Sequence, residues 1–381
     1  MMINMRLFLR FYEDYFRIRY FDSQNLKPLL LAYFVTYRCN LKCCYCDHAH
    51  NNHSHKFPEL DTVQAIEVLK ICRRGIPAIA ISGGEPLLRT DIDLIIKSAR
   101  ILGFKPVSLF TNGLLLPRYE KILDDLDFIQ ISLDTINEKV QDKIFGIQHS
   151  GLTRQLIDII TFYARQQQKR HFRINLNAVL IPDQLDDVIP LYYFASKIGV
   201  RLTVCPQLLD NGQYAPALAA DQKYHSTIDR LVTLKSQNGR VMDTTEFLSH
   251  IREFRSFRCY PYLTPRIYPN GDLVGPCPVI AEKRYPMLEL GSWEKAYQAL
   301  ITDFGKNYRC PSNCFLPCYL ETSTLMIHPW QSLKELFRLN IKLKKVNETE
   351  LMELFKGKKP YPAGNIQPEL HKNPVVTPEA P

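Results

Sequence analysis

Six short apolar runs alternate with amphipathic segments between residues 29 and 206. The runs occupy residues 29–35, 78–82, 106–110, 128–132, 174–180 and 201–205. The segments between them, such as 61–74 and 90–102, carry apolar residues at helical spacing. Near-continuous apolar strands are typical of a parallel sheet that is covered on both faces. The pattern therefore predicts the α/β class, as a partial (β/α)6 TIM-like barrel with its chemistry at the carboxyl ends of the strands.

The remaining sequence predicts additions at both ends of this barrel. Asn270-Gly271 lies between two short apolar runs and predicts a β-hairpin. The tail after residue 356 is rich in proline and poor in core residues, so we expect it to be disordered. We divide the chain into an N-terminal amphipathic segment (1–28), the barrel (29–206), a helical bridge (207–258), a small α+β domain (259–320), C-terminal helices (321–356) and the tail (357–381).

Composition limits the setting and the class of partner. The 381 residues carry a formal net charge of +9, and 46% of them are hydrophobic. No apolar run approaches the roughly 18 residues of a membrane-spanning helix. Charged residues interrupt the N-terminal segment, which is unlike a signal peptide. No nucleic-acid-binding motif accompanies the basic charge, which we assign to a solvated surface. We therefore expect a cytoplasmic protein that does not bind nucleic acid.

Most of the eleven cysteines fall into two clusters, residues 39–46 and 259–318. Clustered thiols in a chain of this length indicate bound metal in a reducing compartment rather than a disulfide framework. The first cluster directly follows the first predicted strand, at the mouth of the barrel. Cys72 and Cys205 stand alone in apolar segments, and we expect both to be core residues.

Three kinds of site compete for the first cluster. A zinc site would use Cys43 and Cys46 with histidines of the polar loop that follows, namely His48, His50, His53 or His55. A redox Cys-x-x-Cys pair usually heads a helix in a thioredoxin-like fold, which six β–α units do not match. Cys39, Cys43 and Cys46 would instead hold a 4Fe–4S cube by three thiolates and leave one iron open to a small molecule. Cys44 is then the spare, for which we expect a small buried side chain.

The spacing Cys39-x3-Cys43-x2-Cys46, with the aromatic Tyr45 before the last cysteine, resembles the signature of radical S-adenosylmethionine (SAM) enzymes. The resemblance implies that these cysteines are the catalytic cluster ligands and that SAM binds the open iron. It implies that an electron, from a donor such as flavodoxin or ferredoxin, cleaves SAM to a 5′-deoxyadenosyl radical. That radical would abstract a hydrogen atom from the substrate.

Motifs at the ends of the next predicted strands agree with this resemblance. Residues 82–88, SGGEPLL, resemble the family motif that holds the methionyl ammonium of SAM. Without Cβ atoms, its glycines let the main chain approach a ligand closely. FTNG, SLDT and the region of Asn177 follow at later strand ends, and the resemblance assigns Ser132 and Asp134 to the ribose and the fifth strand to the adenine. The implied cofactor-binding set is Tyr45, Gly83, Gly84, Glu85, Thr111, Asn112, Ser132, Asp134 and Asn177.

The second cysteine cluster resembles the auxiliary-cluster domain of the SPASM and twitch subgroups. Cys259 and Cys277 bracket the predicted hairpin, and Cys310, Cys314 and Cys318 follow. Because one cube takes four thiolates, the resemblance implies one auxiliary 4Fe–4S cluster, bound by Cys259, Cys277 and two of the last three cysteines. The chain departs from the seven-cysteine SPASM pattern, which argues against a second auxiliary cluster. A zinc knuckle is the alternative.

Residues 5–21 and 330–345 are basic amphipathic segments with aromatic residues. Such helices lie in a membrane interface or pack on a protein core. We favour packing over the open barrel. Peripheral membrane contact is the alternative, and it would make a lipid substrate attractive.

We expect an enzyme, an oxidoreductase or transferase of unresolved reaction, that acts on an unidentified small-molecule, cofactor-biosynthetic or lipid substrate. About 28 residues precede the first predicted strand, fewer than the peptide-recognition domain of many peptide-modifying members would need. A peptide-modifying SPASM-type maturase is the alternative. A non-catalytic iron–sulfur or zinc carrier or sensor is an alternative of another class, although a carrier needs no SAM pocket.

Overall fold

The computed structural model describes residues 5–21, 27–46, 58–146, 151–209, 211–306, 308–310, 314–331 and 334. The polar stretch with His48, His50, His53 and His55 lies outside these residues, as do most of segment 330–345 and the tail from residue 357. The expectations for those parts of the chain stay predictions.

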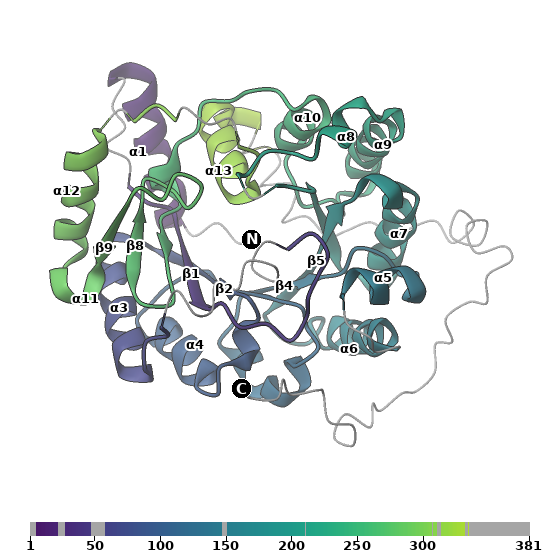
Figure 1. The fold of residues 1–381 in the computed structure, drawn as a ribbon, viewed down its shortest axis with the longest axis horizontal. Helices are drawn as coiled ribbons and strands as arrows, with labels where there is room; N and C mark the ends of the chain where they lie inside the picture. The colour runs from purple at the N-terminus through teal and green to yellow at the C-terminus, as the bar shows by residue number, and fades with distance from the viewer. Residues whose placement is uncertain are drawn as a thin grey trace, which may run out of the picture.

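Six parallel strands form the centre of the fold (Figure 1): β1 (Leu30–Thr36), β2 (Ala78–Gly83), β3 (Val107–Thr111), β4 (Phe128–Ser132), β5 (Arg173–Leu180) and β6 (Arg201–Pro206). They lie in the order β6-β5-β4-β3-β2-β1, so each strand pairs with its neighbour in sequence. Leu31 is in register with Ile79, and Ile129 with Ile174. The strands coincide with the predicted apolar runs, and the partial (β/α)6 barrel is confirmed.

The helices between these strands cover the sheet and return the chain to the start of each next strand. They are α3 (Thr62–Gly75), η2 (Pro86–Leu88), α4 (Ile92–Ile101), η3 (Leu116–Asp124), α5 (Glu138–Ile144), α6 (Leu152–Gln166), η4 (Pro182–Asp187) and α7 (Val188–Ile198), where η marks a 3-10 helix. Asp61 and Gln64 form a capping box that starts α3. Ala65, Val68 and Cys72 of α3 are fully buried in the main core. The core expectation is confirmed for Cys72, whereas Cys205 on β6 is half-buried.

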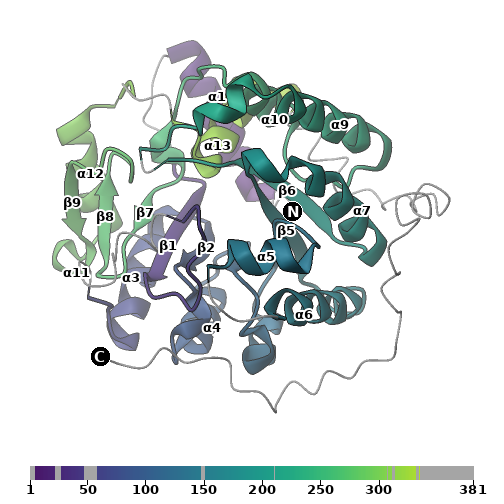
Figure 2. The ribbon, with the colours of Figure 1, turned by 45° about the vertical axis from the view of Figure 1, so that its right-hand side comes forward.

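The predicted hairpin extends the barrel sheet instead of forming a sheet of its own (Figure 2). β7 (Arg266–Ile267) pairs in parallel with β1, and β8 (Asp272–Gly275) and β9 (Lys283–Pro286) follow in antiparallel pairing. Gly271 in the turn has φ +83°, as the Asn-Gly signal predicts. Helices α11 (Met287–Leu290) and α12 (Trp293–Phe304), which were not predicted from the sequence, pack beside β8 and β9. The residues around the second cysteine cluster therefore continue the barrel.

Helices also fill the predicted bridge and the two ends of the described chain. The bridge contains α8 (Pro216–Ala220), α9 (Gln222–Asn238) and α10 (Thr245–Glu253), and it is followed by η5 (Pro261–Leu263). Helix α13 (Pro317–Ile327) lies toward the C-terminal end of the described residues, and α1 (Met5–Phe21) is the first of their helices. Tyr12 and Ile18 of α1 pack on a small core that includes Tyr260 and Met326. One face of α1 thus has the packing role that we favoured.

The other face of α1 is exposed. Phe16, Tyr20 and Phe21 are exposed by 50%, 66% and 77%, and Trp330 beyond α13 by 71%. In the described part of the chain, no helix combines the length and the apolar character needed to cross a bilayer.

Candidate functional site

The loop that carries the first cysteine cluster leaves β1 and docks on the end of α5. Lys42 N–H donates to the carbonyl oxygen of Phe145 at 2.9 Å, and Cys44 N–H donates to that of Ile144 at 3.0 Å. These carbonyl groups lack intrahelical partners because the helix ends there. Gly146 permits the contact, since a Cβ at this residue, which has φ +68°, would lie 1.9 Å from Lys42 O. Backbone contacts therefore fix the loop independently of its thiols.

The turn after β2 holds the same loop from the other side. Gly84 N–H donates to Thr36 O and Glu85 N–H donates to Arg38 O, both at 2.8 Å. A Cβ on Gly83 would lie 2.2 Å from Thr36 O, and one on Gly84 would lie 2.4 Å from Arg38 O. We expected these glycines to admit a ligand, but in the structure they admit the backbone of the cysteine loop. Their contact with SAM stays a prediction.

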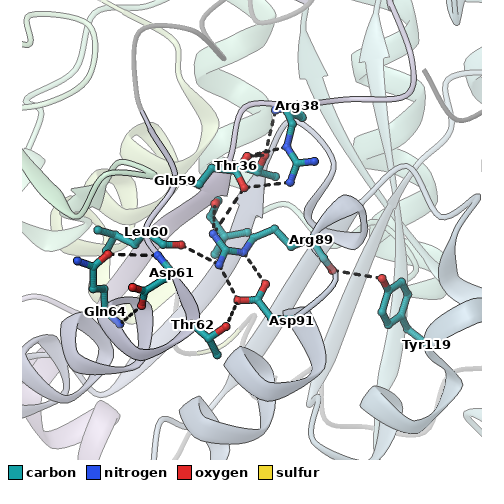
Figure 3. A network of polar contacts seen from close by, with 11 residues as sticks. Thr36, Arg38, Glu59, Leu60, Asp61, Thr62, Gln64, Arg89, Asp91 and Tyr119 are labelled. Carbon is teal, nitrogen blue, oxygen red and sulfur yellow. Dashed lines mark hydrogen bonds and ion pairs between the residues drawn. The ribbon is translucent and has the colours of Figure 1, made fainter. Parts of the chain in front are cut away.

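A buried arginine links this turn to the chain on either side of the cysteine loop (Figure 3). The side chain of Arg89 is 5% exposed and pairs with Asp91 at 2.7 Å. Its guanidinium also donates to Val35 O at 3.1 Å and to Leu60 O at 3.0 Å. Val35 lies in β1 and Leu60 precedes α3, so one side chain fastens three segments.

Glu59 extends this network to the residue before Cys39. Its carboxylate accepts hydrogen bonds from Arg38 Nε at 2.8 Å and Arg38 Nη2 at 3.0 Å, and from the hydroxyl of Thr36. It also lies 3.7 Å from Arg89 Nη1. The network therefore ties both ends of the segment between Thr36 and Glu59 to the body of the barrel.

The structure gathers Cys39, Cys43 and Cys46 and turns Cys44 away. The first three cysteines are half-buried, whereas Cys44 is exposed. The expectation of a buried Cys44 is therefore wrong. The physical reason is that adjacent side chains of the turn point to opposite sides and Cys43 takes the inner one. A spare thiol on the solvent side agrees with the choice of the other three as ligands.

The three inner thiols lie close enough to influence one another. Burial raises the pKa of the Cys39 thiol to about 12, with smaller contributions from Glu85 and Cys46. Burial also raises the pKa of Cys43, and Asp134, Cys46 and Cys39 add to the rise. Because thiolates are the ligand form, bound iron has to displace these protons. Three neighbouring thiols on one loop fit a cube that keeps one iron free of protein.

A site for a single metal ion needs side chains that converge on one point, unlike the three thiols of a 4Fe–4S cube. Among the described ranges, no three His, Cys, Asp or Glu side chains are placed to hold one metal ion. A 4Fe–4S cube does not require such convergence, because each thiolate binds a different iron.

The carboxylate of Glu85 is fully buried and tied to the end of β3. Oε1 accepts from Leu87 N–H at 2.9 Å and Thr111 Oγ1 at 2.7 Å, and Oε2 accepts from Asn112 N–H at 2.7 Å. Burial raises the pKa of Glu85 to about 7, against the effect of these hydrogen bonds. A carboxylate offers about four acceptor positions, so Oε2 keeps one for a further donor.

Asp134 is engaged in the same way at the end of β4. Oδ2 accepts from Tyr45 Oη at 2.9 Å and from Gln141 Nε2 at 3.2 Å, and Oδ1 accepts from Val179 N–H at 2.8 Å. Burial raises the pKa of this carboxyl group. The oxygens of Asp134 bind the protein and position Tyr45 of the cysteine loop, and Oδ1 keeps one acceptor position. The ribose contact of Asp134 stays a prediction.

Ser132 and Asn177 lie at the ends of neighbouring strands. They are half-buried and lie side by side in register on β4 and β5. Their place at neighbouring strand ends agrees with contacts to the ribose and the adenine of SAM, which stay predictions.

The second cysteine cluster gathers around the hairpin and the start of α13. Cys259, Cys277 and Tyr319 form a buried group, and Cys310 and Cys318 pack against it. Cys314 is 4% exposed. Burial raises the pKa of Cys259, and Cys314, Cys310 and Cys277 add to the rise. Five thiols from distant parts of the chain thus meet, and this donor set fits one 4Fe–4S cube.

Sequence reasoning missed the residues that hold the site together. Arg89, Glu59 and Gln141 bind other side chains and backbone, and Gly146 makes room for the loop. The available signal was weak: Arg89 and Asp91 flank a strand-end motif, and a charged pair so close to a buried turn is a candidate for burial. No local sequence pattern around Gly146 predicts its close contact with the backbone of Lys42.

Comparison with protein families and curated proteins gives a consistent result. Residues 33–192 match the family described as the Radical SAM superfamily. The chain is 43% identical over 264 residues to a probable GTP 3′,8-cyclase of Methanococcus maripaludis strain C5. The matched region covers 63% of this chain and 85% of that protein. A probable GTP 3′,8-cyclase of Methanopyrus kandleri is 40% identical over 266 residues, with 68% of this chain and 83% of that protein covered.

Solved structures show a similar fold. Streptococcus suis SuiB superposes with a TM-score of 0.54 and 19% identity over 69% of this chain, which spans 64% of SuiB. Native anSMEcpe with bound AdoMet and the Cp18Cys peptide superposes with a TM-score of 0.51 and 17% identity, over 87% of this chain and 99% of that one. At these identities the likeness concerns the fold.

Gly146→Ala should displace the cysteine loop, because the added Cβ would overlap Lys42 O. Gly151→Ala is the matched control, since Gly151 also has a positive φ (+90°) but nothing lies within 4 Å of its Cβ position. In both variants the new alanine has to adopt a left-handed backbone conformation, which destabilises the folded state by about 1–2 kcal/mol. We expect only Gly146→Ala to reduce the iron bound after anaerobic reconstitution. Equal iron content in the two variants would contradict this account of loop docking.

Arg89→Met should lower the free energy of unfolding by about 3–5 kcal/mol, because it breaks the pair between the buried guanidinium and the half-buried carboxylate of Asp91 and leaves the carbonyl groups of Val35 and Leu60 without this donor. Arg252→Met is the control, since Arg252 forms a two-bond pair with Asp229 on the exposed surface. We expect little change there. Anaerobic urea denaturation measures the free energy of unfolding of both variants. An equal loss in the two variants would show that Arg89 stabilises the fold no more than an exposed ion pair does.

Proposed function

The chain belongs to the radical SAM superfamily, and from that premise we propose that it cleaves S-adenosylmethionine and abstracts hydrogen from a small-molecule substrate. The family uses a 4Fe–4S cluster and SAM. The observation that carries the proposal is the group of inner thiols on the docked loop, Cys39, Cys43 and Cys46, which would hold that cluster. When bound, the cluster supplies the electron that breaks a carbon–sulfur bond of SAM and leaves a 5′-deoxyadenosyl radical.

The residues of this chain would bind and orient the cofactor. Asn112 donates from Nδ2 to Asn40 Oδ1 at 2.8 Å and also interacts with the thiol of Cys39, so it orients one ligand. The free acceptor position of Glu85 and the backbone of Gly84 support binding of the methionyl ammonium. Ser132 and Asn177 would contact the nucleoside.

Tyr45 has a positioning role in this proposal. Its hydroxyl is held by the buried carboxylate of Asp134 at 2.9 Å, and Cys46 is the next residue. Fixing Tyr45 therefore fixes the direction of the chain at the last cluster ligand. Asp134 would act on the cofactor through the loop, and the acceptor position left on Oδ1 would serve the predicted contact with the ribose.

We further propose one auxiliary 4Fe–4S cluster in the second cysteine group. Cys259 and Cys277 supply two ligands, and two of Cys310, Cys314 and Cys318 supply the others. The gathering of these thiols from the hairpin and α13 supports this assignment. Each SAM cleavage consumes one electron, so the proposal includes a donor protein such as flavodoxin or ferredoxin.

The proposed substrate class rests on relatives that are named for a nucleotide. The similarity to proteins named GTP 3′,8-cyclase extends over more than 260 residues, and it makes GTP the first compound to test. Deuterium from a labelled substrate should appear in 5′-deoxyadenosine, because the radical takes its hydrogen atom from that substrate. A peptide substrate is the alternative, and it would be favoured if a labelled peptide but no nucleotide transferred deuterium.

Peripheral membrane contact is a separate proposal, carried by the exposed aromatic face of α1. Phe16 and Tyr20 stack at 5.5 Å between ring centres and remain exposed together with Phe21. Aromatic side chains beside basic residues suit the headgroup region of an anionic bilayer. The proposed place of action is the cytoplasm, with part of the protein at the membrane surface.

The test of function is the release of 5′-deoxyadenosine from SAM by anaerobically reconstituted, dithionite-reduced protein. Cys43→Ala should abolish the release, because it removes a ligand of the SAM cluster. Cys44→Ala is the matched control, since its exposed thiol is one position away, and it should retain full release. Cys277→Ala should keep some uncoupled cleavage but lose product. Normal cleavage in Cys43→Ala would refute the assignment, as would a wild-type protein that binds zinc and no iron.

The membrane proposal predicts flotation of the wild-type chain with vesicles of phosphatidylglycerol and phosphatidylcholine. A variant with Phe16→Ser, Tyr20→Ser and Phe21→Ser should float several-fold less, because the exposed apolar area is lost. A variant with Val63→Ser and Ile101→Ser is the control, since both residues are exposed (78% and 75%) on other helices. No flotation of the wild type, or equal loss in both variants, would reject the membrane surface.

A further inference from the structure

Arg266 connects the first strand of the barrel with the second group of cysteines. It begins β7, where its backbone is in register with Ala32 of β1. Its guanidinium carbon lies 4.3 Å from the centre of the Phe34 ring, also on β1. On its other side, Nη2 lies 4.0 Å from Cys318 Sγ. One side chain thus contacts both the strand that leads to Cys39 and a thiol of the second cluster.

The sulfur of Cys318 is surrounded by hydrogen-bond donors. Cys318 lies in the first turn of α13, and the backbone N–H groups of Cys318 and Tyr319 interact with its sulfur. Nη2 of Arg266 adds a charged donor to these two N–H groups.

One hydrogen-bond donor of Arg266 is not used within the described residues. Its Nε is buried and has no hydrogen-bond partner among the described residues. A buried donor without an acceptor is unfavourable, so a bound acceptor would be favoured here. A guanidinium keeps its proton in proteins, so the side chain of Arg266 is a cation.

A cationic donor beside a cluster has a known physical consequence. Hydrogen bonds to the sulfurs and the surrounding charge help to set the reduction potential of an iron–sulfur cluster. Reduction adds negative charge to the cube, and a nearby cation stabilises the reduced state more than the oxidised one. Such a residue therefore raises the potential.

We propose that Arg266 is a positioning residue of the auxiliary cluster, which holds Cys318 as a thiolate ligand by an N–H···S hydrogen bond and raises the reduction potential of that cluster. The inference rests on the auxiliary cluster proposed above. It selects Cys318 from the three cysteines that follow the hairpin, and it leaves the fourth ligand to Cys310 or Cys314.

The experiment compares four variants of the full chain after anaerobic reconstitution. Iron and sulfide are measured per chain, and both clusters are titrated by electron paramagnetic resonance, so the SAM cluster serves as an internal reference for folding. Arg266→Gln removes the charge, and Arg266→Lys retains it without the planar donor group. Arg284→Gln is the matched control, because it removes an exposed arginine on β9 that lies over Tyr268. Cys318→Ala tests the ligand.

Arg266→Gln should shift the midpoint potential of the auxiliary cluster to a more negative value and leave that of the SAM cluster unchanged. Arg266→Lys should recover part of the shift, and Arg284→Gln should show none. Cys318→Ala should lose the auxiliary signal and keep the SAM-cluster signal. An unchanged auxiliary potential in Arg266→Gln, or an intact auxiliary spectrum in Cys318→Ala, would overturn the inference.

The same measurements separate this inference from the proposed function. A wild-type chain with two 4Fe–4S cubes binds about eight irons. About four irons and a single cluster signal in the wild type would refute the auxiliary cluster itself. Two clusters in the wild type, with an unaltered potential in Arg266→Gln, would refute only the role of Arg266.

Discussion

The contact between the Gly83-Gly84 turn and the backbone of Thr36, Tyr37 and Arg38 is the constraint on which the site depends. Two hydrogen bonds of 2.8 Å cross it, and Cβ atoms on these glycines would lie 2.2 and 2.4 Å from carbonyl oxygens. Only residues without a side chain allow the ends of β1 and β2 to approach so closely. Because Cys39 follows this contact directly, the geometry of the turn sets where the cysteine loop begins.

Buried carboxylates then serve as links between strand ends. Glu85 joins the turn after β2 to Thr111 and Asn112 after β3, and Asp134 joins the end of β4 to Val179 on β5. A buried carboxylate is unfavourable unless it is well hydrogen-bonded. Each of these groups accepts three hydrogen bonds from the protein. The polar residues at the barrel mouth therefore stabilise the scaffold.

The continuity of the sheet places the two groups of cysteines on one structural unit. β7 pairs with β1, so the strand that leads to Cys39 and the strand that follows Cys259 are neighbours. Arg266 on β7 lies against Phe34 on one side and Cys318 on the other. One continuous sheet therefore carries both the strand before the first cysteine group and the strand after Cys259.

Some features were determined by the sequence alone. Strand positions follow from short-range apolar patterning, the hairpin follows from Asn270-Gly271, and the inner cysteines follow from their spacing, because each of these depends on a few neighbouring residues. Tertiary structure decided the rest. The exposure of Cys44, the protein-bound carboxylate of Asp134, the Arg89 network and the pairing of β7 with β1 each depend on partners that are distant in the chain. A local pattern shows which residues are suited to burial or binding, but the partner that satisfies a buried charge or fills the space beside a glycine is fixed only when the whole chain packs.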